Sequence, residues 1–471
     1  MKKTFKYLSL TLTYIFLGLS FIACKGKHNE AVEVLFYETE DVEIPKLLND
    51  DPYRTQGGYA YYYHHQHGEK TMPICAWYAP PPAIDGYPNQ ITIEDYQTLA
   101  ASGINTIYEL HTVERENRLK GLYYANEVGL VYYVHDETPI EALNESGYEI
   151  LEEKYGWYMN KPAYGGNLLK DEPGLVDFEK IATAVKEWSK SKYGNVKHAY
   201  VNHMPSYAES GQLYYGAPYW DKVAPEEIIW ADYVKEYISL AKPAVYSYDF
   251  YPYWRGDKIF DDYFKCLSTA KREAAKGNIP FWNFIQVGNL QTMHMLTYSQ
   301  FSWQVQTSLA YGVKGIQWFC YWQPLGWYDQ VMGLVDRYGN KTIYYDMVQK
   351  INAQIAAVDE VLMQCAQKGV IQMGNSPDAI PEEDKLDKFE KLVNASAEGD
   401  AIIGCFEYRD TGKSVYYVVC NSDENSAKVQ LAFDKNYAVK KVQDATATHL
   451  ASCEEITINL PAGEGALVVV G

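Results

Sequence analysis

The sequence predicts a (β/α)8 barrel followed by a small antiparallel β-sandwich. Short apolar, β-branched or aromatic runs alternate with amphipathic segments from about residue 70 to residue 358. Such alternation is typical of a parallel sheet with helices between its strands, and eight units over about 290 residues fit a closed barrel. After residue 401 apolar residues instead recur at every second position, which is typical of antiparallel strands.

Eight runs are expected to form the barrel strands. They are Ile74–Ala79, Thr106–His111, Leu130–His135, Gly166–Glu172, His198–His203, Val245–Phe250, Pro280–Val287 and Gly315–Trp322. The helices between and after them are expected at Ile93–Ala101, Glu116–Glu127, Val176–Tyr193, Pro225–Ala241, Asp261–Lys276, Tyr298–Tyr311 and Tyr344–Met363. An open, doubly wound sheet is the alternative, but no glycine-rich phosphate loop follows an early strand.

The chain beyond the barrel divides into two segments. Residues 366–398 are charged and loop-like, and we expect them to link the barrel at 66–365 to the sandwich at 399–471. The sandwich strands are expected at Ile402–Tyr408, Ser414–Asn421, Ala427–Phe433, Ala438–Asp444, Glu455–Asn459 and Gly465–Val470. This domain has no evident catalytic constellation, so we expect a structural role, with sugar binding as the alternative.

The N-terminal segment carries a signal-peptide pattern. Three lysines in residues 2–6 precede the uncharged apolar run Tyr7–Ala23, and Cys24 follows in a loose bacterial lipobox. We therefore expect residues 1–24 to be a lipoprotein signal with an acylated Cys24, and residues 25–65 to be a tether and N-terminal extension. The mature protein would be lipid-anchored in a bacterial cell envelope. An uncleaved membrane span is the alternative, although the run is short for one.

The composition favours a carbohydrate partner and argues against nucleic acid. The formal net charge is −19, whereas surfaces that bind nucleic acid are basic. The 44 Tyr, 15 Phe and 11 Trp are compatible with stacking on sugar rings, although many must serve packing. Beyond Cys24, the cysteines form neither a disulfide framework nor a zinc spacing. No metal cluster or nucleotide motif is evident, so no cofactor is expected.

The stretch around Asp171 and Glu172 is the expected catalytic centre. Leu168-Leu169-Lys170 leads into the two carboxylates, and Pro173-Gly174 ends the strand. In a (β/α)8 barrel the carboxyl ends of the strands carry the chemistry. A crowded, dry barrel mouth also raises the pKa of a carboxyl group, which suits a general acid. An ordinary strand-ending turn before an acidic first helical turn is the alternative.

The other strand ends supply further candidate groups. Asp249, which ends the sixth strand, is a candidate catalytic acid. The expected substrate-binding residues are Trp77, Glu109, His111, His135, Asn202, His203, Tyr251, Trp282, Gln286, Trp318 and Trp322. Each has an ordinary alternative, since a strand-end His or Trp more often packs than binds a ligand. Together they predict one aromatic and polar mouth.

These parts resemble the bacterial barrel glycoside hydrolases, broadly the retaining β-glycosidase superfamily and the family 42 galactosidase-like proteins. The resemblance covers roughly residues 70–471. It is carried by Leu169–Gly174, Tyr248–Pro252, Gly315–Trp322 and Gly333–Asn340. It implies a glycoside hydrolase in which Glu172, at the end of the fourth strand, is the general acid/base. The family's Asn before that Glu is Asp171 here, and the seventh strand lacks the family's nucleophilic Glu.

Three alternatives remain for the second carboxylate, in order of preference. Asp249 could serve, with retention if the carboxyl groups lie about 5 Å apart and inversion at about 6.5–9.5 Å. Asp171 could instead orient an acetamido group of the substrate that acts as nucleophile, as the adjacent acids of hexosaminidases do. Glu109 or Glu137 could act across the mouth. The competing classes are a non-catalytic glycan-binding lipoprotein on a degenerate barrel site and a structural surface protein.

Overall fold

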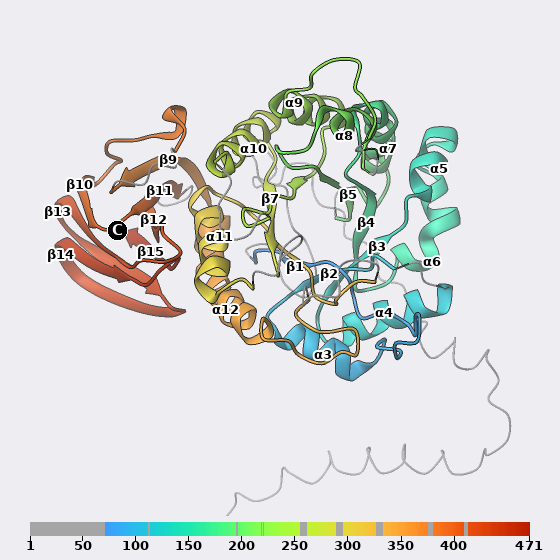
Figure 1. Cartoon of the computed structure of the whole chain (residues 1–471), viewed down its shortest axis with the longest axis horizontal. Helices are drawn as coiled ribbons and strands as arrows, with labels where there is room; N and C mark the ends of the chain where they lie inside the picture. The colour runs from blue at the N-terminus through green and yellow to red at the C-terminus, as the bar shows by residue number, and fades with distance from the viewer. Residues whose placement is uncertain are drawn as a thin grey trace, which may run out of the picture. The chain divides into compact units, whose positions relative to one another are not determined.

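The computed structural model describes residues 71–471, apart from 112–113, 195, 218, 220, 255–260, 289–294, 326–332, 375–379 and 409–412 (Figure 1). The expected signal segment at 1–24, the acylation site Cys24 and the tether at 25–65 lie outside the described residues. Among the described helices, none is both long and apolar enough to cross a bilayer.

Eight parallel strands close into a (β/α)8, or TIM, barrel, which confirms the predicted fold. Each strand pairs with the next along the chain, and β8 pairs with β1. The strands are β1 (Ile74–Ala76), β2 (Thr106–Tyr108), β3 (Val131–His135), β4 (Tyr164–Asp171), β5 (His198–His203), β6 (Tyr246–Tyr248), β7 (Phe281–Gln286) and β8 (Ile316–Phe319). Each overlaps one of the predicted runs.

Helices connect the strands and surround the barrel, as Figure 1 shows. The predicted ones are α3 (Ile93–Ala101), α4 (Arg115–Glu127), α7 (Phe178–Lys190), α9 (Trp230–Ala241), α10 (Tyr263–Gly277), α11 (Tyr298–Ala310) and α12 (Tyr345–Met363). The 3₁₀ turn Leu175–Asp177 forms the start of the helix predicted at Val176–Tyr193. The other short elements were not predicted: α5 (Thr138–Ser146), α6 (Gly156–Met159), α8 (Ser210–Tyr215), the π turn Leu151–Tyr155 and the 3₁₀ turn Glu382–Asp384. In α7, Ile181, Val185 and Trp188 recur at helical spacing and are buried.

Alternation along each strand decides which side chains reach the inside of the barrel. Successive side chains point to opposite faces of a strand. Tyr133 of β3 therefore lies in the interior cluster, whereas Tyr132 and Val134 pack outward against the helices. The interior cluster consists of Cys75, Trp77, Tyr108, Val131, Tyr133, Leu168, Tyr200, Val245, Tyr251, Trp282, Phe284, Phe319 and Cys320.

An irregularity in β4 changes this alternation just before the acidic pair. Leu168 is paired with Tyr200 of β5, and Asp171 is paired with Asn202, so β4 advances three residues where β5 advances two. This count is that of a β-bulge. In a regular strand Lys170 would share the inner face with Leu168. The bulge gives that place to Asp171, beside Asn202.

The C-terminal part is an antiparallel β-sandwich, as predicted, but it begins earlier than expected. Its strands are β9 (Cys365–Met373), β10 (Leu392–Glu398), β11 (Ala401–Tyr408), β12 (Ser414–Cys420), β13 (Ala427–Gln443), β14 (Thr446–Leu460) and β15 (Gly465–Val470). The segment 366–398, expected to be a linker, contributes β9 and β10, which pair with β11 and β13. The polar run Gln367-Lys368-Gly369 within β9 obscured its apolar alternation.

The strand β13 connects the two layers of the sandwich. Its first half pairs with β10 and its second half with β15, while β14 follows it across both halves. The pairing is irregular between Ala432 and Val439, where β13 passes from one partner to the other. The core that the layers enclose includes Tyr416, Phe433 and Ile456.

One face of the sandwich packs against the barrel helices. Trp303 of α11 donates through Nε1 to Asn421 Oδ1 (3.1 Å). Tyr253, in the loop after β6, donates through its hydroxyl to Asp423 Oδ2 (2.9 Å). The apolar cluster around the barrel helices also extends to Tyr417 of the sandwich. The sandwich therefore supports the loop that follows Asp249.

Candidate active site

A cavity of about 430 Å³ lies at the carboxyl ends of the barrel strands. The lining residues are Trp77, Tyr78, Asp171, Glu172, Asn202, Met204, Pro205, Tyr207, Ala208, Glu209, Gln212, Asp249, Tyr251, Trp254 and Phe319. The volume is in the usual range for small-molecule sites. The position is that of the active site in (β/α)8-barrel enzymes.

Three carboxyl groups from two strand ends meet in this cavity. Asp171 ends β4, Glu172 follows it, and Asp249 follows β6. Glu172 has a φ of 44°, which a non-glycine residue seldom adopts. Its backbone N–H donates to Asn202 O (2.9 Å), and its carbonyl accepts from Ala217 N (3.1 Å). This turn brings two consecutive acids to one cavity, which a regular strand would not.

The side chain of Asn202 links the two aspartates. Its Nδ2 donates to Asp171 Oδ1 (3.2 Å) and to Asp249 Oδ1 (3.3 Å). Its Oδ1 accepts from Ser247 Oγ (3.0 Å). Because one amide nitrogen serves both carboxylates, their oxygens lie within two hydrogen-bond lengths of each other.

Loss of water raises the pKa of all three carboxyl groups. It raises the pKa of Asp171 to about 6, although the hydrogen bond from Asn202 acts in the opposite direction. It also holds the pKa of Glu172 well above its usual range, and the charges of Asp249 and Asp171 add to that effect. The pKa of Asp249 is likewise raised, by burial and by Asp171. The cluster therefore retains protons to a higher pH than exposed carboxyl groups do, which suits a general acid.

Aromatic rings form the other walls. Trp254 stacks on Tyr251, with ring centroids 6.2 Å apart and an interplanar angle of 13°, and Phe319 lies 5.6 Å from Tyr251. Trp77 packs edge-on against Phe284 (4.9 Å). Its indole N–H has no acceptor among the described residues. Such walls can hold the apolar face of a sugar while the acids contact its hydroxyl groups.

Six residues predicted from the sequence meet in the cavity: Asp171, Glu172, Asp249, Trp77, Asn202 and Tyr251. The other eight do not line it. They are Glu109, His111, His135, His203, Trp282, Gln286, Trp318 and Trp322.

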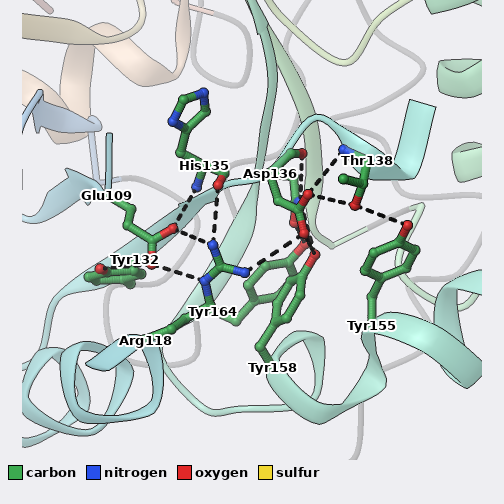
Figure 2. Close-up of polar contacts among 10 residues, drawn as sticks. Glu109, Arg118, Tyr132, His135, Asp136, Thr138, Tyr155, Tyr158 and Tyr164 are labelled. Atoms are coloured by element: carbon green, nitrogen blue, oxygen red, sulfur yellow. Dashed lines mark hydrogen bonds and ion pairs between the residues drawn. The ribbon is translucent and has the colours of Figure 1, made fainter. Parts of the chain in front are cut away.

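Glu109 belongs to a buried ion-pair network on the outer side of the barrel wall (Figure 2). Its carboxylate accepts from Arg118 Nε (3.0 Å) and Nη2 (2.9 Å) and from the backbone N–H of His135 (3.1 Å). Glu137 pairs instead with Lys170 (2.9 Å). Both carboxylates form ion pairs outside the cavity, contrary to the expectation that one of them acts across the mouth.

The three histidines expected at the mouth lie apart from the cavity. His203 is buried on the outer face of β5, where Nδ1–H donates to Ser247 O (2.9 Å) and burial lowers its pKa to about 3. His111 contacts a backbone carbonyl through Nε2 (3.2 Å), and burial lowers its pKa to about 4. His135 is partly exposed, and its Nε2 lies 3.9 Å from Glu137 Oε1, outside the cavity lining.

The three tryptophans expected to stack on sugar are packing residues. Trp282 is in the barrel interior, with its ring 5.9 Å from Tyr200. Trp318 faces outward and donates to Asn352 Oδ1 (2.9 Å) on α12. Trp322 is fully buried. The residues that take their place, Tyr207 and Trp254, lie in loops beyond the strand ends.

Gln286 ends β7, where the resemblance expects a nucleophilic Glu. Its Oε1 accepts from Tyr253 N (3.1 Å), and its Nε2 donates to Gly288 O (2.9 Å). It is completely buried and anchors the neighbouring loop. The seventh strand thus supplies no carboxylate, and a second acid must come from elsewhere in the cavity.

The fold and the cavity define a (β/α)8-barrel protein with an acidic, aromatic pocket at the catalytic end. Among the residues that the structure describes, no group of three His, Cys, Asp or Glu side chains could hold a metal ion.

No family model matches the chain, and the curated proteins include no match. One similar solved structure is an α-amylase from Anoxybacillus, with 9% identity over 88% of this chain and 98% of that chain and a TM-score of 0.46. A glucosidase from Croceicoccus marinus has 10% identity over 88% of this chain and 97% of that chain, with a TM-score of 0.40. A β-galacturonidase from Eisenbergiella tayi has 13% identity over 60% of this chain and 51% of that chain, with a TM-score of 0.39. All three are glycosidases, but similarity this distant assigns neither a family nor a substrate.

Proposed function

We propose that this protein is a glycoside hydrolase with Glu172 as the general acid. The observation that carries the proposal is the meeting of Asp171, Glu172 and Asp249 in one aromatic-walled cavity. Glycosidic cleavage needs a proton for the leaving oxygen and a second carboxylate at the sugar. The raised pKa of Glu172 lets this residue keep its proton to a higher pH than an exposed Glu would.

We assign the role of second carboxylate to Asp249. It comes from a different strand end, and its charge raises the pKa of Glu172 more than that of Asp171 does. Ionised Asp249 would attack the anomeric carbon or take a proton from an attacking water, while Glu172 protonates the leaving oxygen as the C–O bond breaks. The anomeric configuration of the first product, observed by proton NMR, distinguishes retention from inversion.

Asp171 supports a variant of this mechanism. With a 2-acetamido sugar, Asp171 would orient the acetamido group, which would then act as nucleophile in place of Asp249. This variant requires that hydrolysis depend on the acetamido group. It also requires that Asp171→Asn reduce turnover more than Asp249→Asn.

A panel of aryl glycosides and of gut and plant oligosaccharides tests the proposal. We expect the wild type to release sugar from at least one member and Glu172→Gln to release far less. A folded wild type that cleaves none of them would contradict it.

A non-catalytic glycan-binding protein is the second candidate, favoured by the uncharged Gln286 at the end of β7. It predicts binding without product release, and equal affinity in the wild type and Glu172→Gln. Calorimetric titration with the same oligosaccharides measures both.

We also propose that Cys24 anchors the protein to a bacterial membrane, supported by the lysines and the apolar run that precede it. A labelled fatty acid fed to the expressing bacterium should label the wild type but not Cys24→Ser. Equal labelling of the variant would refute acylation at this site.

A further inference from the structure

A chain of buried polar side chains lies in the barrel interior beneath the cavity. Tyr108 OH donates to Gln317 Oε1 (3.0 Å), and Gln317 Nε2 donates to Ser247 Oγ (2.8 Å). Tyr200 OH lies 2.7 Å from Gln317 Oε1 and 2.6 Å from Ser247 Oγ, and its single hydrogen serves one of the two. All four residues are fully buried. Because buried polar groups are costly without partners, this network constrains their orientations strongly.

The network fixes the orientation of the Asn202 amide. Ser247 has a single hydroxyl hydrogen. When Gln317 Nε2 and the Tyr200 hydroxyl both donate to Ser247 Oγ, that hydrogen is available to Asn202 Oδ1 (3.0 Å). The amide nitrogen then faces the cavity, where it donates to Asp171 and Asp249. The opposite orientation would set the amide oxygen against two carboxylates.

We propose that Asn202 is a positioning residue, held by Ser247 and Gln317, that donates to both aspartates and so sets the pH range in which they act with Glu172. The role in turnover rests on the proposed function. The arrangement itself depends only on contacts beneath the cavity. Asn202 was expected from the sequence to bind substrate, whereas its amide forms hydrogen bonds with Asp171, Asp249 and Ser247.

The physical effect is on the charge of the two aspartates. A hydrogen bond donated to a carboxylate favours its ionised form, and Asn202 lowers the pKa of both Asp171 and Asp249 in this way. The other charged groups that face them are Glu172, His135, Glu137 and Lys170. The phenols and the thiol around Asp249 are those of Tyr207, Tyr233, Tyr246, Tyr248, Tyr251 and Cys266.

Substitution of Ser247 tests the inference without altering any of those groups. In Ser247→Ala the amide loses its donor and can rotate, so the acidic limb of the kcat/KM pH profile should move upward by about one pH unit. Ser247→Thr, which retains the hydroxyl, should restore the original limb. Tyr133→Phe is the matched control. This substitution removes another hydroxyl group from the barrel interior, one that lies 2.7 Å from His198 Nδ1. It should leave the acidic limb of the pH profile in place.

A measurement without substrate separates this inference from the proposed function. NMR titration of ¹³C-carboxyl aspartate should show two carboxyl groups shifted to higher pH in Ser247→Ala. That shift in a protein without hydrolytic activity would retain the positioning role and overturn the proposed function. An unshifted titration in a folded, active variant would overturn the inference. If Ser247→Ala does not fold, Ser247→Cys, a weaker donor of similar size, should shift in the same direction.

Discussion

Replacing Glu172 with Gln removes the proton donor and preserves the shape of the side chain. General acid catalysis contributes about 10²- to 10⁴-fold, or about 2.7–5.4 kcal/mol of transition-state stabilisation. The loss should depend on the leaving group, because a dinitrophenolate departs without a proton whereas an alkoxide does not. We therefore expect kcat/KM in Glu172→Gln to fall by that factor for alkyl glycosides and far less for dinitrophenyl glycosides.

Folding provides an independent check on the same variant. The pKa of Glu172 is raised in the folded protein, so its ionisation lowers stability as the pH rises above the unfolded-state value of about 4.5. Gln carries no such penalty. The Tm of Glu172→Gln should equal that of the wild type at pH 4 and exceed it at pH 7. Glu137→Gln, which removes a carboxylate outside the cavity, is the control. An equal loss of activity on all leaving groups would refute the general-acid role.

Three further predictions follow from the geometry. Asp249→Asn should reduce kcat/KM by about 100-fold or more. The basic limb of the pH profile should also move to lower pH, because the substitution removes the Asp249 charge that raises the pKa of Glu172. Trp254→Ala should raise KM with little change in Tm, because Trp254 lies partly exposed in the cavity wall; an unaltered KM would remove it from the binding surface. Arg118→Leu should cost about 3–5 kcal/mol in urea unfolding, because it leaves the buried carboxyl group of Glu109 without its ion-pair partner. Adding Glu109→Gln should recover part of that loss, and full stability of the single variant would contradict the structural role of the pair.

The barrel, the strand positions and the acidic centre could be predicted because each has a local signal. Apolar runs ending in polar residues mark the strands, and Pro173-Gly174 marks the end of β4. The sequence alone did not show which side chains at each strand end point into the barrel mouth. Glu109, His203 and Trp318 end strands as Asn202 does, but they are on the opposite face.

The cavity also depends on two backbone features without a recognised sequence pattern. The bulge in β4 moves Asp171 to the inner face, and the left-handed conformation of Glu172 keeps the next acid there as well. Tyr207 and Trp254 were missed because loops, whose paths depend on tertiary contacts, carry them to the cavity. The linker at 366–398 was assigned from its charge, although its alternate apolar residues pair in the sandwich.

Eleven of the thirteen residues of α11 are buried, glutamines and serines among them, because the C-terminal sheet covers the side that most barrel helices expose to water. A barrel expressed without residues 366–471 would lose the acceptor of the Trp303 indole N–H and expose the side of α11 that the sheet covers, and would be prone to aggregate. The same constraint applies in evolution. Recombination cannot exchange the C-terminal domain as an independent unit, and a homologue that lacks this domain must have a different α11 sequence.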